Sequence, residues 1–145
     1  MQLLQFIATF AATLFAGAAL YINVAEHPAR MGLETTTAAL HWAPSYKRAT
    51  LLQAPLALVS FFSGLGVWLM GANRWWLVAG LLIVAVVPFT FVAIMPTNHK
   101  LLEPSRDLGS ADTRHLLEKW GKLHAVRTVL SLMASVIYLW LLQEA

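Results

Sequence analysis

The sequence predicts an all-α protein: an integral membrane four-helix bundle with an interfacial or re-entrant helical segment between spans one and two. Of its 145 residues, 59% are hydrophobic and 12% are charged. Soluble domains are typically only about 45–50% apolar and about 25% charged. Four apolar runs are each long enough to cross a hydrocarbon core of about 30 Å. At this length we expect one transmembrane domain, residues 1–145, without a soluble module.

The first span is expected at residues 3–25, a stretch that carries no charged side chain. A cleaved signal peptide is disfavoured because Met1 and Gln2 provide no basic region and the apolar stretch is too long. Pro28 then disfavours further helix. The mixed segment 31–44 is too short to span a membrane, so it is the expected interfacial or re-entrant piece.

The remaining spans are expected at residues 46–71, 75–96 and 120–142. Pro55 is expected to kink the second span, and Pro88 to interrupt the third. The charged segment that precedes the fourth span is expected to be a solvated loop with some helical turns.

Four spans place both termini on one side of the membrane and the two long polar connections, residues 26–45 and 97–119, on the other. Of the ten Lys and Arg residues, only Arg74 lies on the side of the termini. The positive-inside rule therefore predicts cytoplasmic connections and termini outside. The cations flank apolar runs and are not interleaved with aromatic residues on a polar face, so a nucleic-acid partner is excluded.

Polar residues gather where spans one and three end and where spans two and four begin, so they share one membrane face. Ionisable residues within spans face the bundle interior and are functional candidates by default. In the fourth span, Trp120, His124, Arg127 and Ser131 share one helical face, whereas Lys119 points away. The polar layer is completed by Asn23, Glu26, His27, Tyr46, Gln53, Asn98 and His99.

One chemistry open to this layer is metal binding by His27, His99 and His124 with Glu26, a set that suits a mononuclear iron or copper site. The chain has no cysteine, which excludes disulfides, thiolate metal sites and iron–sulfur clusters. It also lacks the paired Glu-x-x-His motifs of di-iron bundles. Haem is disfavoured because the histidines lie near the interface.

A second chemistry needs no metal: His124 accepts a proton and Arg127 stabilises the resulting anion, while Trp120 stacks on a flat aromatic substrate. A structural alternative stays open, in which His124 and Arg127 pair with Glu26 and with carbonyls at helix ends. The candidate catalytic residues are His124, Arg127, Asn98 and Tyr46, and the candidate substrate-binding residues are Trp120, Gln53 and Asn23.

Four segments together resemble the anthrone-oxygenase-like family of small four-helix membrane proteins, whose bacterial members are mostly of unknown function. The resemblance covers essentially the whole chain, and the last two segments are the more specific. They are residues 21–30, residues 46–49 with Gln53-Ala54, Met95-Pro96-Thr97-Asn98-His99-Lys100-Leu101-Leu102, and Trp120-Gly121-Lys122-Leu123-His124-Ala125-Val126-Arg127.

The resemblance implies a four-helix membrane bundle and oxidation of anthrones to anthraquinones by dioxygen without an organic cofactor. It also implies that His124 is the base, that Arg127 and Asn98 hold the enolate-like oxygen, and that Trp120 faces the ring system. The pair His27 and His99 would indicate a metal-assisted variant.

The leading hypothesis is a membrane-embedded oxidoreductase that acts with dioxygen on a hydrophobic aromatic or quinone-like substrate in a polar pocket near one membrane face. The alternative is a non-catalytic accessory or ligand- or metal-binding subunit of a larger membrane complex. A transporter is disfavoured because the apolar half offers no polar path. The expected partners are the lipid bilayer, a hydrophobic small molecule, and either further copies of the chain or a membrane complex.

Overall fold

The computed structural model describes residues 1–144, and every regular element within them is helical. Four long helices, Gln2–Met31, Thr35–Leu69, Trp75–Leu101 and Ala111–Gln143, are each long and apolar enough to cross a membrane. The predicted fold class is thus confirmed. The elements are α1 (Gln2–Tyr21), the π-helical turn η1 (Ile22–Glu26), α2 (His27–Met31), α3 (Thr35–Leu69), α4 (Trp75–Val84), α5 (Val86–Phe89), the π-helical turn η2 (Thr90–Ile94), α6 (Met95–Leu101) and α7 (Ala111–Gln143).

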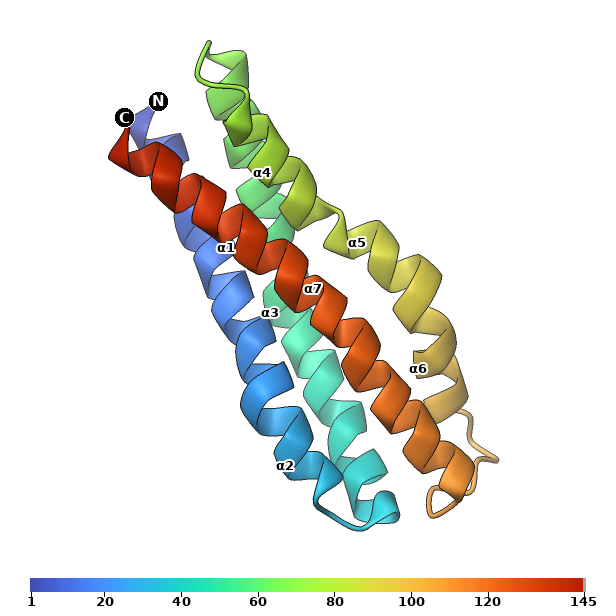
Figure 1. Ribbon diagram of the computed structural model, residues 1–145. Helices are drawn as coiled ribbons and strands as arrows, with labels where there is room; N and C mark the ends of the chain where they lie inside the picture. The colour runs from blue at the N-terminus through green and yellow to red at the C-terminus, as the bar shows by residue number, and fades with distance from the viewer. Residues whose placement is uncertain (145) are drawn as a thin grey trace.

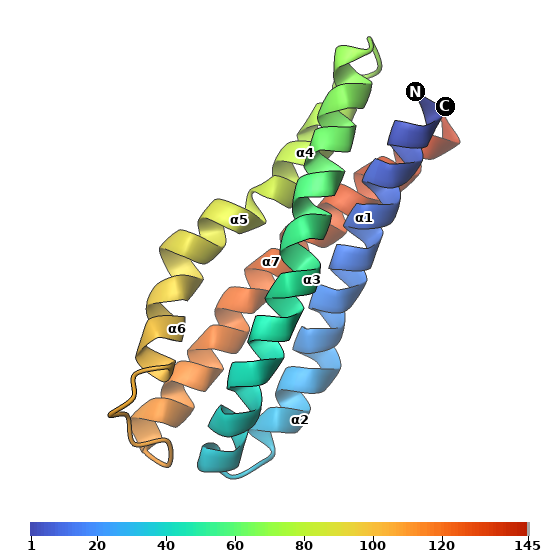
Figure 2. The ribbon, with the colours of Figure 1, turned by 180° about the vertical axis from the view of Figure 1, so that it is seen from behind.

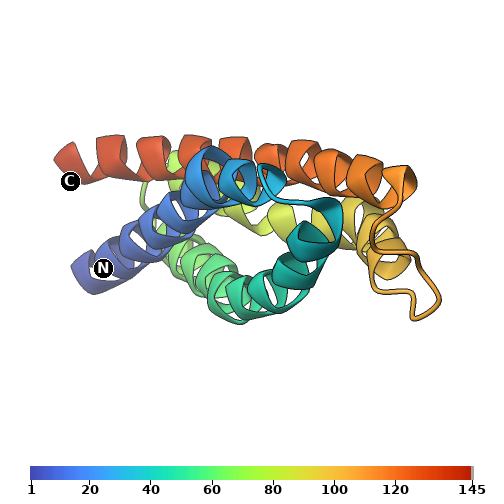
Figure 3. The ribbon, with the colours of Figure 1, turned by 90° about the horizontal axis from the view of Figure 1, so that it is seen from below.

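The long helices run alternately up and down, so both termini lie at one end with the α3–α4 turn, and the other two connections lie at the opposite end (Figures 1 and 2). Each packs on its neighbours in the sequence, and α7 closes the bundle against α1. Seen from below, α7 lies along one side of the bundle and the middle of α3 lies on the opposite side (Figure 3). This is the predicted arrangement of the connections; which side of a membrane they occupy stays a prediction.

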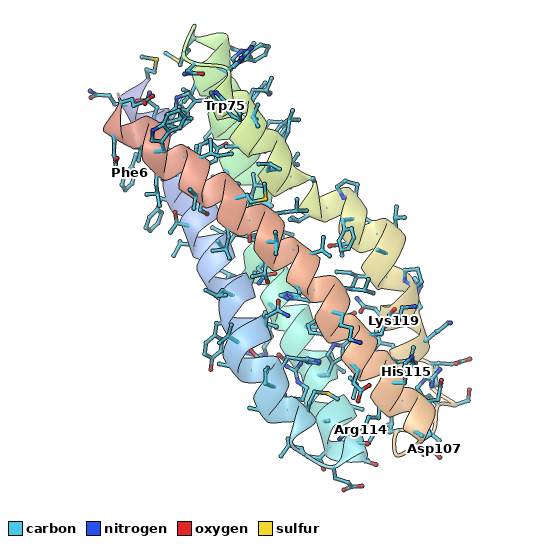
Figure 4. The ribbon with its side chains drawn as sticks, in the orientation of Figure 1. Phe6, Trp75, Asp107, Arg114, His115 and Lys119 are labelled. Carbon is cyan, nitrogen blue, oxygen red and sulfur yellow. The ribbon has the colours of Figure 1, made fainter. Side chains whose placement is uncertain are left out.

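Large apolar side chains cover much of the outside of the bundle. Phe6 is 58% exposed and Trp75 is 40% exposed, and Figure 4 places both near the end that carries the termini. A soluble monomer rarely exposes contiguous apolar patches of this kind. The outer surface is therefore suited to lipid.

Two π-helical turns allow the first and third long helices to continue past a proline. η1 ends two residues before Pro28, and η2 ends two residues before Pro96. In η1 the amide of His27 donates to the carbonyl of Ile22, five residues earlier. Proline lacks an N–H and its ring clashes with the preceding turn of an α-helix, and a wider turn relieves both problems. The prediction that Pro28 ends the first helix is therefore wrong.

The segment 31–44 is not a separate interfacial or re-entrant helix, because most of it forms the first turns of α3. Ala38, Ala39 and Trp42 are buried in a core cluster that also contains Trp120 of α7. The sequence placed this boundary by hydropathy, whereas packing against α7 keeps the segment in line with the rest of α3.

The second half of the charged segment before residue 120 is helical, since α7 begins at Ala111. The side chain of Ser110 accepts a hydrogen bond from the amide of Thr113 at 3.1 Å and so caps the helix. Arg114 donates to the hydroxyl of Thr35 at 2.7 Å and to backbone carbonyls of the α2–α3 connection, and Figure 4 shows it on that side of α7. Arg114, which was predicted to lie in a solvated loop, therefore connects α7 to the start of α3 by hydrogen bonds.

Proline affects the two middle helices differently. The third long helix breaks at Ala85, between α4 and α5, and α5 then leaves the direction of α4 (Figure 1). The predicted interruption near Pro88 is confirmed, because proline cannot donate to the carbonyl four residues earlier. By contrast, α3 continues as one helix through Pro44 and Pro55. It ends at a turn in which Gly71 adopts a φ of 91°, a left-handed conformation that favours glycine.

The half of the bundle that carries the termini is held by close packing around Tyr138. This tyrosine is fully buried, and its hydroxyl donates to the carbonyl of Ser60 at 3.4 Å. A Cβ atom on Gly64 would collide with that hydroxyl and press on the carbonyl of Trp76. Gly64 therefore permits α3, α4 and α7 to approach one another here.

We expect Gly64→Ala to destabilise the protein by about 1–3 kcal/mol, because the added methyl overpacks a filled core. The measurement is the thermal unfolding midpoint of purified protein in detergent. Gly17→Ala is the matched control, since nothing lies within 4 Å of a Cβ atom there. Equal midpoints for the two variants would contradict the assigned role of Gly64.

Candidate functional site

A cavity of about 350 Å³ lies in the half of the bundle that carries the two connections. Its volume is within the range of small-molecule sites, roughly 300–1,000 Å³. The apolar wall is formed by Ile22, Ala49, Leu51, Ile94 and Met95. The residues with polar groups are Tyr46, Lys47, Thr50, Gln53, Thr90, Asn98, Trp120, His124 and Arg127.

Six of the candidate residues named from the sequence line this cavity. On α7, Trp120, His124 and Arg127 follow the i, i+4, i+7 spacing that places side chains on one helical face. Tyr46 and Gln53 share a face of α3 in the same way. Asn98 completes the set from α6. The exposed Lys119 lies on the outer side of α7, as expected (Figure 4).

Asn23 determines the orientation of the His124 imidazole. The Asn23 amide nitrogen donates to the carbonyl of Gly121 at 3.0 Å, so its oxygen faces His124 Nδ1 at 2.8 Å. Thr128 also donates to that oxygen, at 2.5 Å. An amide oxygen only accepts, so Nδ1 of His124 carries a proton. Nε2 is therefore the ring nitrogen left for a molecule in the cavity.

Asn23 was predicted to bind substrate, but it lies behind His124 and does not line the cavity. Its place in η1 explains the difference, because the π-helical turn belongs to the part of the first helix that packs on α7. The residue contacts the histidine and not the cavity space.

Arg127 is a buried cation without a carboxylate partner in residues 1–144. One guanidinium nitrogen donates to Gln53 Oε1 at 2.8 Å, and the guanidinium carbon lies 5.5 Å from the centre of the Phe15 ring. Hydrogen bonds and an aromatic face replace only part of the hydration that a cation loses on burial. An anion in the cavity would supply the missing charge.

Unpartnered polar atoms concentrate around the cavity. Within the described residues, five buried side-chain nitrogen or oxygen atoms have no hydrogen-bond partner, and four of these belong to cavity-lining residues. Buried polar groups in proteins are nearly always paired with protein, water or ligand, so these atoms are available to a polar molecule in the cavity. The four atoms are Gln53 Nε2, Asn98 Oδ1, Trp120 Nε1 and Arg127 Nε.

The aromatic rings of Trp120, His124 and Tyr46 line the cavity, and those of His27 and Trp42 pack against them without lining it. The Trp120 ring lies 5.1 Å from the His27 ring and 5.0 Å from the His124 ring, centre to centre. Trp42 meets Trp120 edge-on at 6.0 Å and stacks on Tyr46 at 4.6 Å. Packing of this kind holds the aromatic side chains in fixed rotamers.

Both ring nitrogens of His27 are occupied. Nε2 lies 2.9 Å from the carbonyl oxygen of Leu117 and must donate, whereas Nδ1 lies 2.9 Å from an Arg30 guanidinium nitrogen and must accept. Arg30 in turn forms a salt bridge of 2.5 Å with Glu26. Neither His27 nor Glu26 lines the cavity, so this network joins α2 to the start of α7 and is structural.

The four predicted metal ligands are not assembled. No group of three or more His, Asp or Glu side chains in residues 1–144 is placed to hold a metal ion. His99 is exposed, because it follows the inward-facing Asn98 and so points away from the bundle. His27 has no free nitrogen, and Glu26 is paired with Arg30. The residues present do not fit the predicted His/Glu site.

Two residues of the hydrogen-bond networks next to the cavity were not singled out from the sequence. Arg30 binds both Glu26 and His27, and Thr128 binds the Asn23 amide that orients His124. Each lies three or four residues from its helical neighbour in the network, a spacing at which side chains on a helix meet. This spacing is the sequence feature from which Arg30 and Thr128 could have been predicted to join these networks.

The comparison with protein-family models matches residues 42–137 to the family described as anthrone oxygenase. The chain belongs to the anthrone oxygenase family. The resemblance stated from the sequence motifs is confirmed. The matched segment contains all six candidate residues that line the cavity, whereas Asn23 and the Glu26–His27–Arg30 network precede it.

Three fungal relatives carry the same description. Anthrone oxygenase ptaC of Pestalotiopsis fici is 29% identical over 124 residues, covering 74% of this chain and 86% of the relative. Anthrone oxygenase tpcL of Aspergillus fumigatus is 36% identical over 64 residues, or 42% of this chain and 40% of the relative. Anthrone oxygenase AgnL2 of Paecilomyces divaricatus is 34% identical over 68 residues, 41% of each chain. No solved structure matches.

We expect Arg30→Met to destabilise the fold by about 3–5 kcal/mol, because it removes the salt bridge of Glu26, which then keeps only Ser45, and the donor to His27 Nδ1. The measurement is the unfolding midpoint in detergent. Arg48→Met is the matched control, since Arg48 is exposed and its loss should cost within about 0.5 kcal/mol. If both variants melt at the same temperature, the network does not hold α2 against α7.

Proposed function

We propose that this protein is a membrane-embedded oxygenase that oxidises a hydrophobic aromatic substrate of the anthrone type with dioxygen in the 350 Å³ cavity. The observation that carries the proposal is the meeting of an oriented histidine, an uncompensated arginine and unpartnered polar atoms in one cavity. Membership of the anthrone oxygenase family and the printed names of the fungal relatives support the same reaction class.

The first step is removal of a proton from carbon. An anthrone carries a CH₂ group between two aromatic rings, conjugated through them to a carbonyl, so loss of a proton gives an aromatic enolate. Nε2 of His124 is the base, because Nδ1 is held by Asn23. The negative charge moves to the carbonyl oxygen, where Arg127 and the Gln53 amide can donate hydrogen bonds.

The second step is reaction of the enolate with dioxygen. The enolate transfers one electron to dioxygen, and the resulting radical and superoxide combine into a peroxide at the former CH₂ carbon. Proton return from His124 and loss of the remaining C–H expel water and leave a second carbonyl. In total, the CH₂ group and dioxygen become a carbonyl group and one water, so no external reductant is required.

The membrane position suits such a substrate. A flat polycyclic molecule dissolves in the bilayer, and the apolar lining formed by Ile22, Leu51 and Ile94 resembles that environment. The exposed Lys47 also lines the cavity and marks an opening near the connections. By the positive-inside rule, this opening faces the cytoplasmic leaflet.

We expect His124→Ala to lower kcat for anthrone oxidation by about 10²–10⁴, the usual contribution of a general base. The measurement is oxygen consumption by purified protein with anthrone, together with formation of the quinone product. His99→Ala is the matched control, because His99 is exposed and lies outside the cavity lining. Unchanged oxygen consumption in His124→Ala would sink the proposed role.

Asn23→Leu tests the orientation of the base separately from substrate binding. Loss of the Nδ1 partner lets the imidazole turn or change tautomer, so kcat should fall about 10²-fold. KM for the anthrone should stay within about twofold, because Asn23 does not line the cavity. Gln53→Leu, which alters the lining, should instead raise KM. A rise in KM alone for Asn23→Leu would show that it binds substrate after all.

A further inference from the structure

A second, smaller cavity of about 110 Å³ adjoins the site cavity. Both cavities are lined by Thr50, Thr90, Met95 and Arg127, so they meet along this edge. The remaining walls of the small cavity carry no polar side chain. They are formed by Phe15, Ala54, Ala57, Val86, Val87 and Phe91.

We propose that this small cavity binds dioxygen and passes it from the bilayer to the site cavity. The inference rests on the proposed function, because it assigns a binding place to the second substrate of that reaction. Dioxygen is small and apolar, and it dissolves better in hydrocarbon than in water. A cavity with apolar walls that faces the membrane interior is therefore the place where it would collect.

The size and walls of the cavity select the ligand. An apolar protein cavity of about 150 Å³ stays dry and binds xenon or benzene, so one of comparable size accepts a diatomic gas. A three-ring substrate needs a site of about 300 Å³ or more and is excluded. The small cavity thus complements the site cavity, which is larger, because the polar lining residues of the small cavity lie only at the edge that the two cavities share.

The helix break creates the space and leads to the lipid. Val86 and Val87 belong to α5, just past the break at Ala85, and Ala54 and Ala57 place only methyl groups on the facing side of α3. The outer wall is formed by side chains such as that of Phe91, which is 65% exposed on the surface of the bundle. Movement of this side chain would connect the cavity to the hydrocarbon.

Arg127 lies at the junction of the two cavities. Its Nε has no hydrogen-bond partner in the part of the chain that the structure describes. Its guanidinium carbon lies 5.5 Å from the centre of the Phe15 ring, which lines the small cavity. Transfer of one electron from the enolate converts neutral dioxygen into superoxide, which is an anion. A cation placed between the two reactants stabilises both the enolate before this transfer and the superoxide after it.

Xenon binding tests the cavity without reference to activity. In lipid nanodiscs, methyl NMR signals of Ala54, Ala57, Val86 and Val87 should shift saturably with xenon pressure. The methyl signals of Val59, which is 46% exposed and does not line the cavity, should shift only linearly, as lipid-facing groups do. Linear shifts for all five residues would overturn the proposal.

Kinetics test the route. Ala54→Phe fills the small cavity and should lower kcat/KM for dioxygen about tenfold, while kcat/KM for the anthrone at saturating dioxygen changes less than about twofold. Val59→Phe is the matched control on the same helix, and both values should stay near wild type. Ala54→Leu provides a milder filling if the larger variant does not fold.

The outcomes separate the two proposals. An unchanged kcat/KM for dioxygen in a folded Ala54→Phe protein that no longer binds xenon would overturn the dioxygen route and leave the proposed function intact. If wild type does not oxidise anthrones, the proposed function fails, and the assignment of dioxygen to the cavity fails with it even where xenon binds. Saturable xenon binding together with the selective loss of kcat/KM for dioxygen supports the proposal.

Discussion

A polar group buried inside an apolar bundle must find its hydrogen-bond partner within the protein, and this constraint organises the half of the molecule that carries the connections. Glu26, Arg30 and His27 satisfy one another and the carbonyl of Leu117, which fastens α2 to α7. Asn23 satisfies His124 and Gly121 and so aligns α1 with the same helix. The Glu26–His27–Arg30 network is fully hydrogen-bonded and holds helices together. The polar atoms that stay unpaired in the described residues lie mostly around the site cavity.

The two π-helical turns connect backbone geometry to the site. η1 carries Asn23, which orients His124, and η2 carries Thr90 and Ile94, which line the cavity. Each turn precedes a proline, whose missing N–H and ring clash disfavour a regular α-helical turn at that place. The π-helical turns therefore let two long apolar helices continue past a proline and also position side chains at or next to the cavity.

The residues of the candidate site come from two parts of the chain. The six candidate residues that line the cavity belong to the segment matched by the family model, whereas Asn23 belongs to the helix that precedes it. His124 and the residue that orients its imidazole thus come from different helices. Such an arrangement holds the imidazole in place through the packing of α1 on α7, independently of whether a substrate is bound.

The sequence by itself determined the four apolar helices and the end of the bundle at which polar groups gather. It also determined the shared face of Trp120, His124 and Arg127. These features follow from hydropathy and helical periodicity, which are local properties of the sequence. It did not determine the helix boundaries near residues 35 and 111, since Trp42 and Arg114 extend those helices through distant contacts. Nor did it decide which polar residues are paired. Only the tertiary structure shows that both nitrogens of His27 are hydrogen-bonded, that His99 faces outward and that Arg127 has no carboxylate partner among residues 1–144. These contacts depend in part on side chains and carbonyls of other helices.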